Sequence, residues 1–373
     1  MSADDEPYTG PPATRPPAAW QPVWLPPAPV FAPVLPPPPP PGMRWAPPPG
    51  TPPHDVPQPY LLAMRSRDWA WWRPLFGLLL FAVVYFVLAA AAGIAALVGL
   101  LASGTDPGVL PDLVTVDLTD PWVLLFVNVS LIVAIPCVWM LWAVLHGMGI
   151  GWSSSVLGRL RWRLLPAYTG LAFAVLGAGI GLSVLLGFLL GEEDVTGPVP
   201  GLGWLLVVVL LTTPLQSAAE EYVFRGYLSQ AVAGWIGRPE VGALVAAVTT
   251  AALFSALHAP TDVPTFLDRF AFGLAASAVV WLTGGLEAAI VLHAVNNVLV
   301  FVLAGLLGEG VATTEVPLSL GLVALVVSLL TMAAYVAVVA RTRRRLAPET
   351  STGALDLRTR PPWGLATPAP SVG

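Results

Sequence analysis

The segment Ala219–Gly226, with the sequence AEEYVFRG, places three ionisable side chains inside an apolar run that otherwise predicts a membrane-spanning helix. One charged side chain at the centre of a bilayer costs roughly 2.5–3.5 kcal/mol on insertion scales, so three within six residues require partners or a water-filled cavity. On a helix, Glu221 and Arg225 are four residues apart and share a face, so the arginine can neutralise this glutamate. Glu220 points about 100° away from that face and has no local counter-ion.

Two interpretations of this cluster are open from the residues alone. A salt-bridged polar seam between helices accounts for Glu221 with Arg225 but leaves Glu220 unexplained. An unpaired carboxylate inside a membrane is by default the mark of a functional site. The segment therefore favours a functional role for Glu220.

The composition is that of a multi-pass membrane protein. Hydrophobic residues make up 56% of the 373 residues and charged residues only 10%, against about 25% charged residues in a typical soluble domain. The single cysteine, Cys137, excludes an intramolecular disulfide and a cysteine-based metal site. No GxGxxG-type phosphate loop is present, which argues against a nucleotide-driven pump. We expect no nucleic-acid partner.

Eight apolar runs each approach the ~20 residues that a bilayer core requires. They cover about 75–102, 121–146, 165–190, 203–229, 240–259, 266–283, 286–307 and 316–340. The sequence therefore predicts an all-α fold, a polytopic membrane helix bundle of about eight transmembrane helices, over residues 65–345.

Arginines and acidic residues alternate between successive loops. Arginines lie before the first span, between the fourth and fifth and after the eighth, and between the second and third at Arg159, Arg161 and Arg163. The opposite loops carry mainly aspartate and glutamate. The positive-inside rule then predicts that both termini are cytoplasmic. We expect a multi-pass protein of the plasma membrane.

The two ends of the chain are predicted to be disordered cytoplasmic tails, residues 1–64 and 346–373. Residues 1–60 contain 23 of the 41 prolines, a density that excludes regular helix and sheet and favours polyproline II conformation. Three tryptophans within this tail, Trp20, Trp24 and Trp45, are compatible with a docking motif for a partner protein. A semi-rigid solvated tail is the simpler interpretation.

Two of the four histidines lie in apolar spans that follow the glutamate pair. Phe254 and His258 are four residues apart, as are His293 and Asn297, so each pair shares a helical face. A histidine in a membrane helix is more often a hydrogen-bonded packing residue than a catalyst. In combination, however, a carboxylate and a histidine can activate water while a second histidine and an amide donate to a developing oxyanion.

Helix geometry permits these side chains to meet. Glu220 and His258 differ by roughly 9 Å in height above the turn that joins their helices, at 1.5 Å per residue. His293 lies roughly 13 Å beyond its own turn. Helix tilt and side-chain reach can close these gaps, so convergence is allowed but not required.

The motifs occur in the order Glu220-Glu221…Arg225-Gly226, Phe254…His258 and His293…Asn297. In this order they resemble the CPBP intramembrane proteases, the family of CAAX prenyl endopeptidases and bacteriocin-processing or Abi-type proteins. The resemblance covers about 203–300 and includes the segment 270–273, FAFG, which is similar to the family's weaker third motif. Glu287 departs from the pattern, which has an aromatic residue there.

The resemblance implies an intramembrane endopeptidase with Glu220 as general base and His258 as the residue that holds and activates water. It implies that His293 and Asn297 form the oxyanion site, with Glu221, Arg225 and Phe254 in support. The expected substrate is a peptide or membrane protein reached from the lipid bilayer.

The use of a metal ion is open. Glu220, His258 and His293 could ligate zinc and leave one position for water, and family members are often labelled metalloproteases. No His-Glu-x-x-His pair is present, however, and Asn297 is a poor zinc ligand. A metal-independent glutamate mechanism without a cofactor is the favoured interpretation.

Two other functions compete with proteolysis. A non-proteolytic immunity or scaffold protein of the same fold would bind a partner through the same cavity. A proton-coupled transporter with Glu220 as carrier is less favoured, because the sequence has no evident inverted repeat or broken helix pair.

Overall fold

The computed structural model describes residues 51–102, 104, 117–190, 196–308 and 318–354. All of them belong to one compact unit, Ala46–Thr359. The predicted tails outside these ranges, with Trp20, Trp24 and Trp45, lie outside the described residues.

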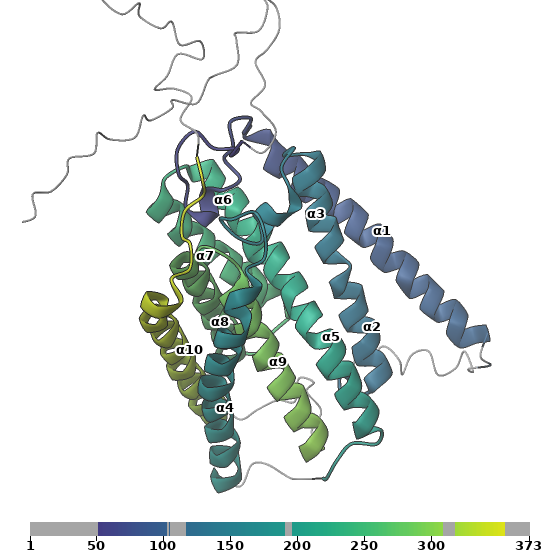
Figure 1. Cartoon of the computed structure of the whole chain (residues 1–373). Coiled ribbons are helices and arrows are strands. Elements are labelled where there is room, and N and C mark those ends of the chain that lie inside the picture. Colours follow the sequence, from purple (N-terminus) through teal and green to yellow (C-terminus); the bar gives the residue numbers. More distant parts are fainter. Residues whose placement is uncertain (1–50, 103, 105–116, 191–195, 309–317, 355–373) are drawn as a thin grey trace, which may run out of the picture. The chain divides into compact units, whose positions relative to one another are not determined.

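The described residues form helices and no β-strands (Figure 1). In chain order the α-helices are α1 Trp72–Ala102, α2 Pro121–Ile132, α3 Ala134–Val144, α4 Leu165–Leu190, α5 Leu202–Val223, α6 Ser229–Ile236, α7 Pro239–Leu257, α8 Val263–Thr283, α9 Glu287–Leu307 and α10 Leu318–Leu346. The short 3-10 helices are η1 Tyr60–Leu62, η4 Ile150–Ser153 and η5 Trp162–Leu164, and η6 Phe224–Leu228 is a π-helical turn.

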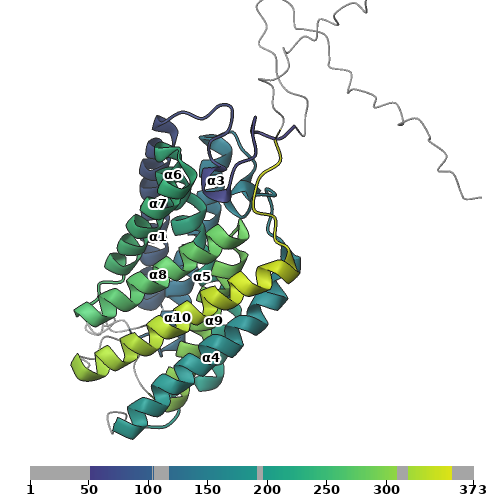
Figure 2. The same cartoon turned by 90° about the vertical axis from the view of Figure 1, so that its left-hand side faces the viewer.

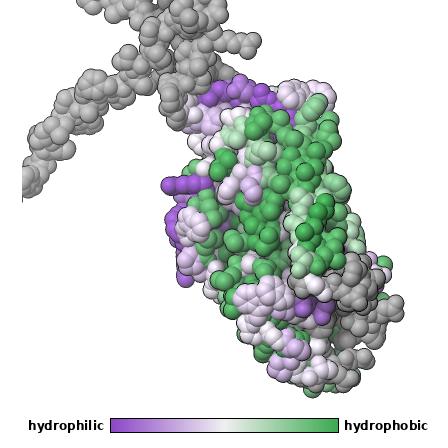
Figure 3. Space-filling view, turned by 90° about the vertical axis from the view of Figure 1, so that its right-hand side faces the viewer, coloured by the Kyte–Doolittle hydropathy of each residue, from purple (hydrophilic) through white to green (hydrophobic). Residues whose placement is uncertain are grey.

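Eight of the described helical segments are long and apolar enough to cross a membrane. This confirms the predicted membrane bundle and its number of spans. In Figure 3, hydrophobic residues cover much of the face on the side of α1. Many large apolar side chains of α1 are exposed, among them Leu79 at 61% and Phe86 at 73%, as expected for a helix that faces lipid.

Two of the spans are interrupted. The second is divided at Val133 into α2 and α3, where Pro136 supplies no N–H for the carbonyl of Ile132. The fourth continues from α5 through η6 into α6 and so reaches Ile236 rather than the predicted 229. The π-turn begins at Phe224, three residues after Glu221, and contains Arg225, and such turns are frequent at functional sites.

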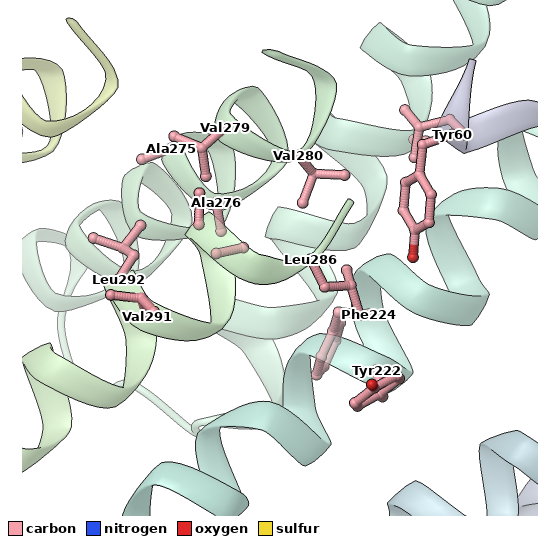
Figure 4. Packing of buried hydrophobic residues seen from close by; sticks show 14 of the residues in the cluster. Tyr60, Tyr222, Phe224, Ala275, Ala276, Val279, Val280, Leu286, Val291 and Leu292 are labelled. Atoms are coloured by element: carbon pink, nitrogen blue, oxygen red, sulfur yellow. The ribbon is translucent and has the colours of Figure 1, made fainter. Parts of the chain in front are cut away.

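The helix α9 lies inside the bundle, against α5, α4 and α8. On another side, α10 packs against α8 and α4 (Figure 2). Buried side chains fill the space between these helices (Figure 4), including Tyr222, Phe224, Ala276, Val279, Val280, Leu286 and Leu292. The close packing of α5 on α9 sets two of the polar motifs opposite each other.

Residues 51–64 correct the predicted boundary of the N-terminal tail. They fold onto the bundle, with Tyr60 through Met64 all at most 4% exposed. The hydroxyl of Tyr60 donates to the carbonyl of Ser153, and the His54 ring bonds the carbonyl of Ala63 at 2.7 Å. Proline density hid the short apolar segment YLLAM, which buries enough surface to order this part of the chain.

Residues 347–354 likewise correct the predicted C-terminal boundary. The amide of Thr352 donates to the carbonyl of Gln58 at 2.8 Å, so this segment pairs with the N-terminal one. Gly284, the C-cap of α8, has φ +69°, and a Cβ there would lie 2.4 Å from the carbonyl oxygen of Glu349. Only glycine combines this conformation with so close an approach.

Arg161 lies between the second and third spans, as predicted, but it is buried rather than exposed on a loop. It is 4% exposed and forms a two-pronged ion pair with Glu287, with Nε to Oε1 at 2.9 Å and Nη2 to Oε2 at 2.6 Å. Its Nη1 donates to the carbonyl of Glu349 at 2.8 Å. The pair explains why an acidic residue stands at position 287, because Glu287 fixes the start of α9 to Arg161 and, through it, to residues 347–354.

Candidate active site

The predicted ion pair between Glu221 and Arg225 is present and fully buried. Arg225 Nη1 donates to Glu221 Oε1 at 2.9 Å, and both side chains are 0% exposed. The other terminal nitrogen of Arg225 donates to the carbonyl of Gly273 on α8 at 2.9 Å. A buried charge is tolerated when it is paired and hydrogen-bonded in this way.

Glu221 has a second partner that the sequence did not indicate. Its Oε1 also lies 2.9 Å from Nδ1 of His293 on α9. A carboxylate can only accept, so Nδ1 carries the proton and donates it to Glu221. This bond turns the Nε2 edge of the His293 ring toward Glu220.

Glu220 lies on the other face of α5, as predicted. Its Oε1 accepts a hydrogen bond from Nε2 of Gln216 at 2.5 Å. Its Oε2 lies 3.9 Å from Nε2 of His258 and 3.8 Å from Nε2 of His293. Oε2 is a buried atom with no hydrogen-bond partner among the described residues. The three candidate residues from α5, α7 and α9 therefore meet at one point.

His258 is the more accessible of the two histidines. It is the C-cap residue of α7, and its side chain is 36% exposed against 3% for that of His293. Its Nδ1 lies 2.7 Å from the carbonyl of Phe254, which can only accept. Nδ1 therefore donates to this carbonyl, and Nε2 is the ring nitrogen that faces Glu220.

Asn297 lies one turn beyond His293 and faces α5. Its Nδ2 is 3.4 Å from Oε1 of Gln216 and 3.5 Å from Oγ of Ser217. Its Oδ1 accepts from Nδ2 of Asn296 at 3.2 Å. The amide therefore points its N–H groups toward the glutamate side of the site through long, weak bonds.

Aromatic rings pack around the histidines. Phe254 lies 4.4 Å from the ring of His258 and 5.7 Å from that of His293, centroid to centroid. Phe272 meets the ring of His293 edge-on at 5.0 Å and stacks on Phe254 at 5.8 Å. These contacts restrict both imidazoles. They also give the FAFG segment a structural role, since Phe272 packs on a histidine while Gly273 accepts from Arg225.

A cavity of about 390 Å³ borders the cluster. Its polar wall includes Glu220, His258, His293 and Asn297, and much of the remainder is apolar, with Leu124, Leu131, Val300, Phe301 and Met332. A largely apolar cavity with a few converging polar groups is the usual form of a binding site for a small or extended ligand.

The residues fit a zinc ion only in part. Both histidines have the hydrogen-bonded Nδ1 that metal-ligating histidines usually show, and Glu220 offers an oxygen between them. Within the described ranges, however, no group of three His, Cys, Asp or Glu side chains is spaced to hold a metal ion. The donor set of one carboxylate, two imidazoles and an adjacent amide fits a bound water as well as it fits a metal.

Sequence reasoning missed several polar residues of this region, among them Asn128, which also lines the cavity. Gln216 stands four residues before Glu220, a helical spacing that was visible in the sequence. Asn296 is adjacent to a predicted residue. Asp268 and Ser328 also line the cavity, and only tertiary packing of α8 on α10 brings them together there.

Comparisons with known proteins bear on this site. Residues 202–299 match the family described as type II CAAX prenyl endopeptidase Rce1-like. The "Uncharacterized protein YyaK" of Bacillus subtilis (strain 168) is 26% identical over 202 residues, which are 52% of this chain and 65% of that protein. The match thus spans less than two thirds of the relative's length. No solved structure matches this chain.

The matched segment contains all of the converging residues, from Glu220 on α5 to Asn297 on α9. The Rce1-like family is a family of peptidases. Both findings agree with the resemblance that the three polar motifs show. Over residues 202–299 this chain is similar to the Rce1-like family, which is consistent with the resemblance to the CPBP membrane proteases.

Proposed function

We propose that this protein is an intramembrane endopeptidase that hydrolyses a peptide bond with a water molecule activated by Glu220. One observation carries the proposal. The buried, unpartnered Oε2 of Glu220 faces Nε2 of both histidines at 3.8–3.9 Å, on the wall of the cavity. These separations are too long for direct hydrogen bonds and are of the kind that one water bridges.

In the proposed reaction, Glu220 and His258 hold the water. Oε2 of Glu220 takes one proton as the water oxygen attacks the carbonyl carbon of the substrate, while the lone pair on Nε2 of His258 accepts a hydrogen bond from the other hydrogen. Glu220 then returns its proton to the leaving nitrogen. The products are a carboxylic acid and an amine, and Glu220 is regenerated as the carboxylate.

His293 and Asn297 are proposed to bind the oxyanion of the tetrahedral intermediate. In this role His293 donates from both ring nitrogens, Nδ1–H to Glu221 and Nε2–H to the oxyanion in the cavity. The weak bonds of Asn297 at 3.4–3.5 Å leave its amide available to donate to substrate. Preorganised donors of this kind typically contribute about 10²–10³-fold each to kcat.

The substrate is proposed to be a peptide or membrane protein that enters from the bilayer. The apolar cavity wall and the eight spanning helices support this class. A peptide with a prenylated C-terminal cysteine is the first candidate, because the matched family is described as prenyl endopeptidases. We place the protein in the plasma membrane with both termini cytoplasmic, where the proline-rich tail could dock a partner.

We further propose that no cofactor is required, with zinc as the alternative. In that alternative Glu220, His258 and His293 would hold the ion, and the ion would supply Lewis-acid polarisation of the water. Cleavage assays with and without a strong zinc chelator, beside elemental analysis of the purified protein, distinguish the two. Loss of cleavage with the chelator and its recovery on adding zinc would overturn the metal-independent proposal.

The test of proteolysis compares cells that produce the wild-type protein with cells that produce Glu220→Gln at equal abundance. New peptide termini should occur in the wild-type cells and be absent with the variant. The wild type should also cleave the peptide corresponding to such a site after purification. If a physiological phenotype persists with Glu220→Gln and no terminus depends on Glu220, the protein is a non-proteolytic immunity or scaffold protein of the same fold.

A further inference from the structure

Gln216 lies between the proposed general base, Glu220, and a proposed oxyanion donor, Asn297. It lies on α5, four residues before Glu220 and on the same face, and it is 5% exposed. Its Nε2 donates to Oε1 of Glu220 at 2.5 Å, while its Oε1 faces Nδ2 of Asn297 at 3.4 Å and Oγ of Ser217 at 3.3 Å. One carboxamide therefore contacts the proposed base and a proposed oxyanion donor.

The hydrogen bonds around Gln216 run in a single direction. Asn296 donates to Asn297, Asn297 donates to Gln216, and Gln216 donates to Glu220. A carboxylate can only accept, so Glu220 fixes which end of the Gln216 amide carries nitrogen, and Gln216 in turn fixes the orientation of Asn297. Aligned amides of this kind also strengthen one another.

We propose that Gln216 is a positioning residue for this reaction, one that engages Oε1 of Glu220 so that only Oε2 faces the histidines, and that aims the Asn297 amide at the same point. The inference rests on the proposed function. Without Gln216, the Glu220 carboxylate is free to rotate, and either oxygen can turn away from the water. Misplacing a reacting group by about 1 Å can cost on the order of 100-fold in rate.

Two substitutions remove the amide donor of Gln216, one with the acceptor oxygen retained and one without it. Gln216→Glu keeps the size of the side chain but replaces the donor with a second carboxylate beside Glu220. Gln216→Leu removes both functions and leaves an apolar side chain. Both should lower kcat by about 10- to 100-fold with KM nearly unchanged, because the proposed role acts on Glu220 and Asn297 rather than on substrate binding.

Gln230→Leu is the matched control. Gln230, on α6, is likewise a buried glutamine, but it contacts the carbonyls of Trp152 and Gly226 rather than Glu220. Its loss should lower the thermal midpoint and leave kcat of the folded protein unchanged. A purely structural Gln216 would behave in the same way as Gln230.

The assay uses the purified full chain and a quenched fluorescent peptide built on a Glu220-dependent cleavage site. Thermal midpoints supply a readout that does not depend on turnover. They are measured for Gln216→Leu, Asn297→Ala, Glu220→Ala and the double variants that combine Gln216→Leu with each of the others. The midpoint shift of each double variant should differ from the sum of the two single shifts, because Gln216 interacts with both partners. Wild-type kcat in folded Gln216→Leu would overturn the inference while leaving proteolysis intact. Coupled midpoints without any Glu220-dependent cleavage would instead overturn the proposed function.

Discussion

At the scale of single residues, Glu220 and Glu221 are neighbours with different surroundings. Glu221 is enclosed by Arg225 and His293, whereas Oε2 of Glu220 has no partner among the described residues. The sequence alone predicts that Glu221 acts mainly through stability. The contact with His293 adds a second expectation, because this carboxylate also orients a proposed oxyanion donor.

Glu220→Gln and Glu221→Gln should therefore fail in different ways. Glu220→Gln should fold with a thermal midpoint near that of the wild type and lose turnover. Glu221→Gln should lose stability, since breaking one half of a buried pair costs roughly 3–5 kcal/mol, and the fraction that folds should also have a reduced kcat. Cleavage rate and thermal midpoint in detergent measure both. Near-wild-type cleavage by Glu220→Gln, with none by folded Glu221→Gln, would invert the assignment of base and support.

His146 provides a prediction about pH. It lies after the end of α3, is 4% exposed and contacts the hydroxyl of Tyr227 at 3.1 Å. Burial, with a smaller repulsion from Arg73, lowers the pKa of His146 from 6.5 to about 4. The unfolded chain thus binds this proton at higher pH than the folded protein. Stability should be full above about pH 6.5 and fall by about 1.4 kcal/mol per unit as the pH drops toward 4.

Thermal midpoints between about pH 7.5 and pH 5 test this expectation in wild-type protein and in His146→Phe. The variant should lose less stability over this interval than the wild type. Tyr227→Phe is the control, because it removes the hydroxyl contact and keeps the titrating ring. Equal slopes for the wild type and His146→Phe would show that another group governs the acid response.

At the scale of elements, the geometry of the site depends on the close packing of α7 against α8. A Cβ on Gly273 would lie 2.8 Å from Cα of Ala251 on α7 and 3.3 Å from Nη2 of Arg225. Gly273→Ala should therefore separate the helices and weaken the bond from Arg225 to the carbonyl of residue 273. We expect a loss of about 1–3 kcal/mol in stability, as for other overpacked sites, measured as a lower thermal midpoint.

Gly177→Ala is the matched control for this substitution. Gly177 lies within α4, and a Cβ there meets nothing within 4 Å. Alanine is favoured over glycine inside a helix by up to about 1 kcal/mol, so this variant should be neutral or slightly more stable. If Gly273→Ala is as stable as Gly177→Ala, the close approach of α7 and α8 does not constrain the site.

The elements also show what the sequence could predict. Length and hydropathy were sufficient for the eight spans, and helical spacing was sufficient for the pair Glu221–Arg225. The contact of Gln216 with Glu220 has the same four-residue spacing, so the sequence could have predicted it as well, but it was overlooked. The pair Arg161–Glu287 joins residues 126 apart, and no local periodicity indicates such a partner. From the sequence, Arg161 was indistinguishable from the solvent-exposed arginines expected in a cytoplasmic loop.

At the scale of the whole molecule, the described ends of the chain are part of the bundle. Residues 51–64 and 347–354 pair with each other, and Glu349 is held by Arg161 and Arg163. Through Glu287, Arg161 connects these ends to the first turn of α9, six residues before His293. Sequence composition predicted only disorder here, because a short buried segment within proline-rich sequence has no periodicity of its own.

The arrangement of the bundle in the membrane gives the last prediction. The alternation of arginine and acidic loops places both termini in the cytoplasm. Thr196, between α4 and α5, and Thr350, after α10, are both exposed and lie at opposite ends of the spans that flank them. In a Cys137→Ser background, a cysteine at position 196 should react with an impermeant thiol reagent added outside intact cells, and one at position 350 should react only after permeabilisation. Because both positions are exposed in the folded protein, failure to react reports sidedness rather than burial, and the reverse pattern of labelling would overturn the orientation.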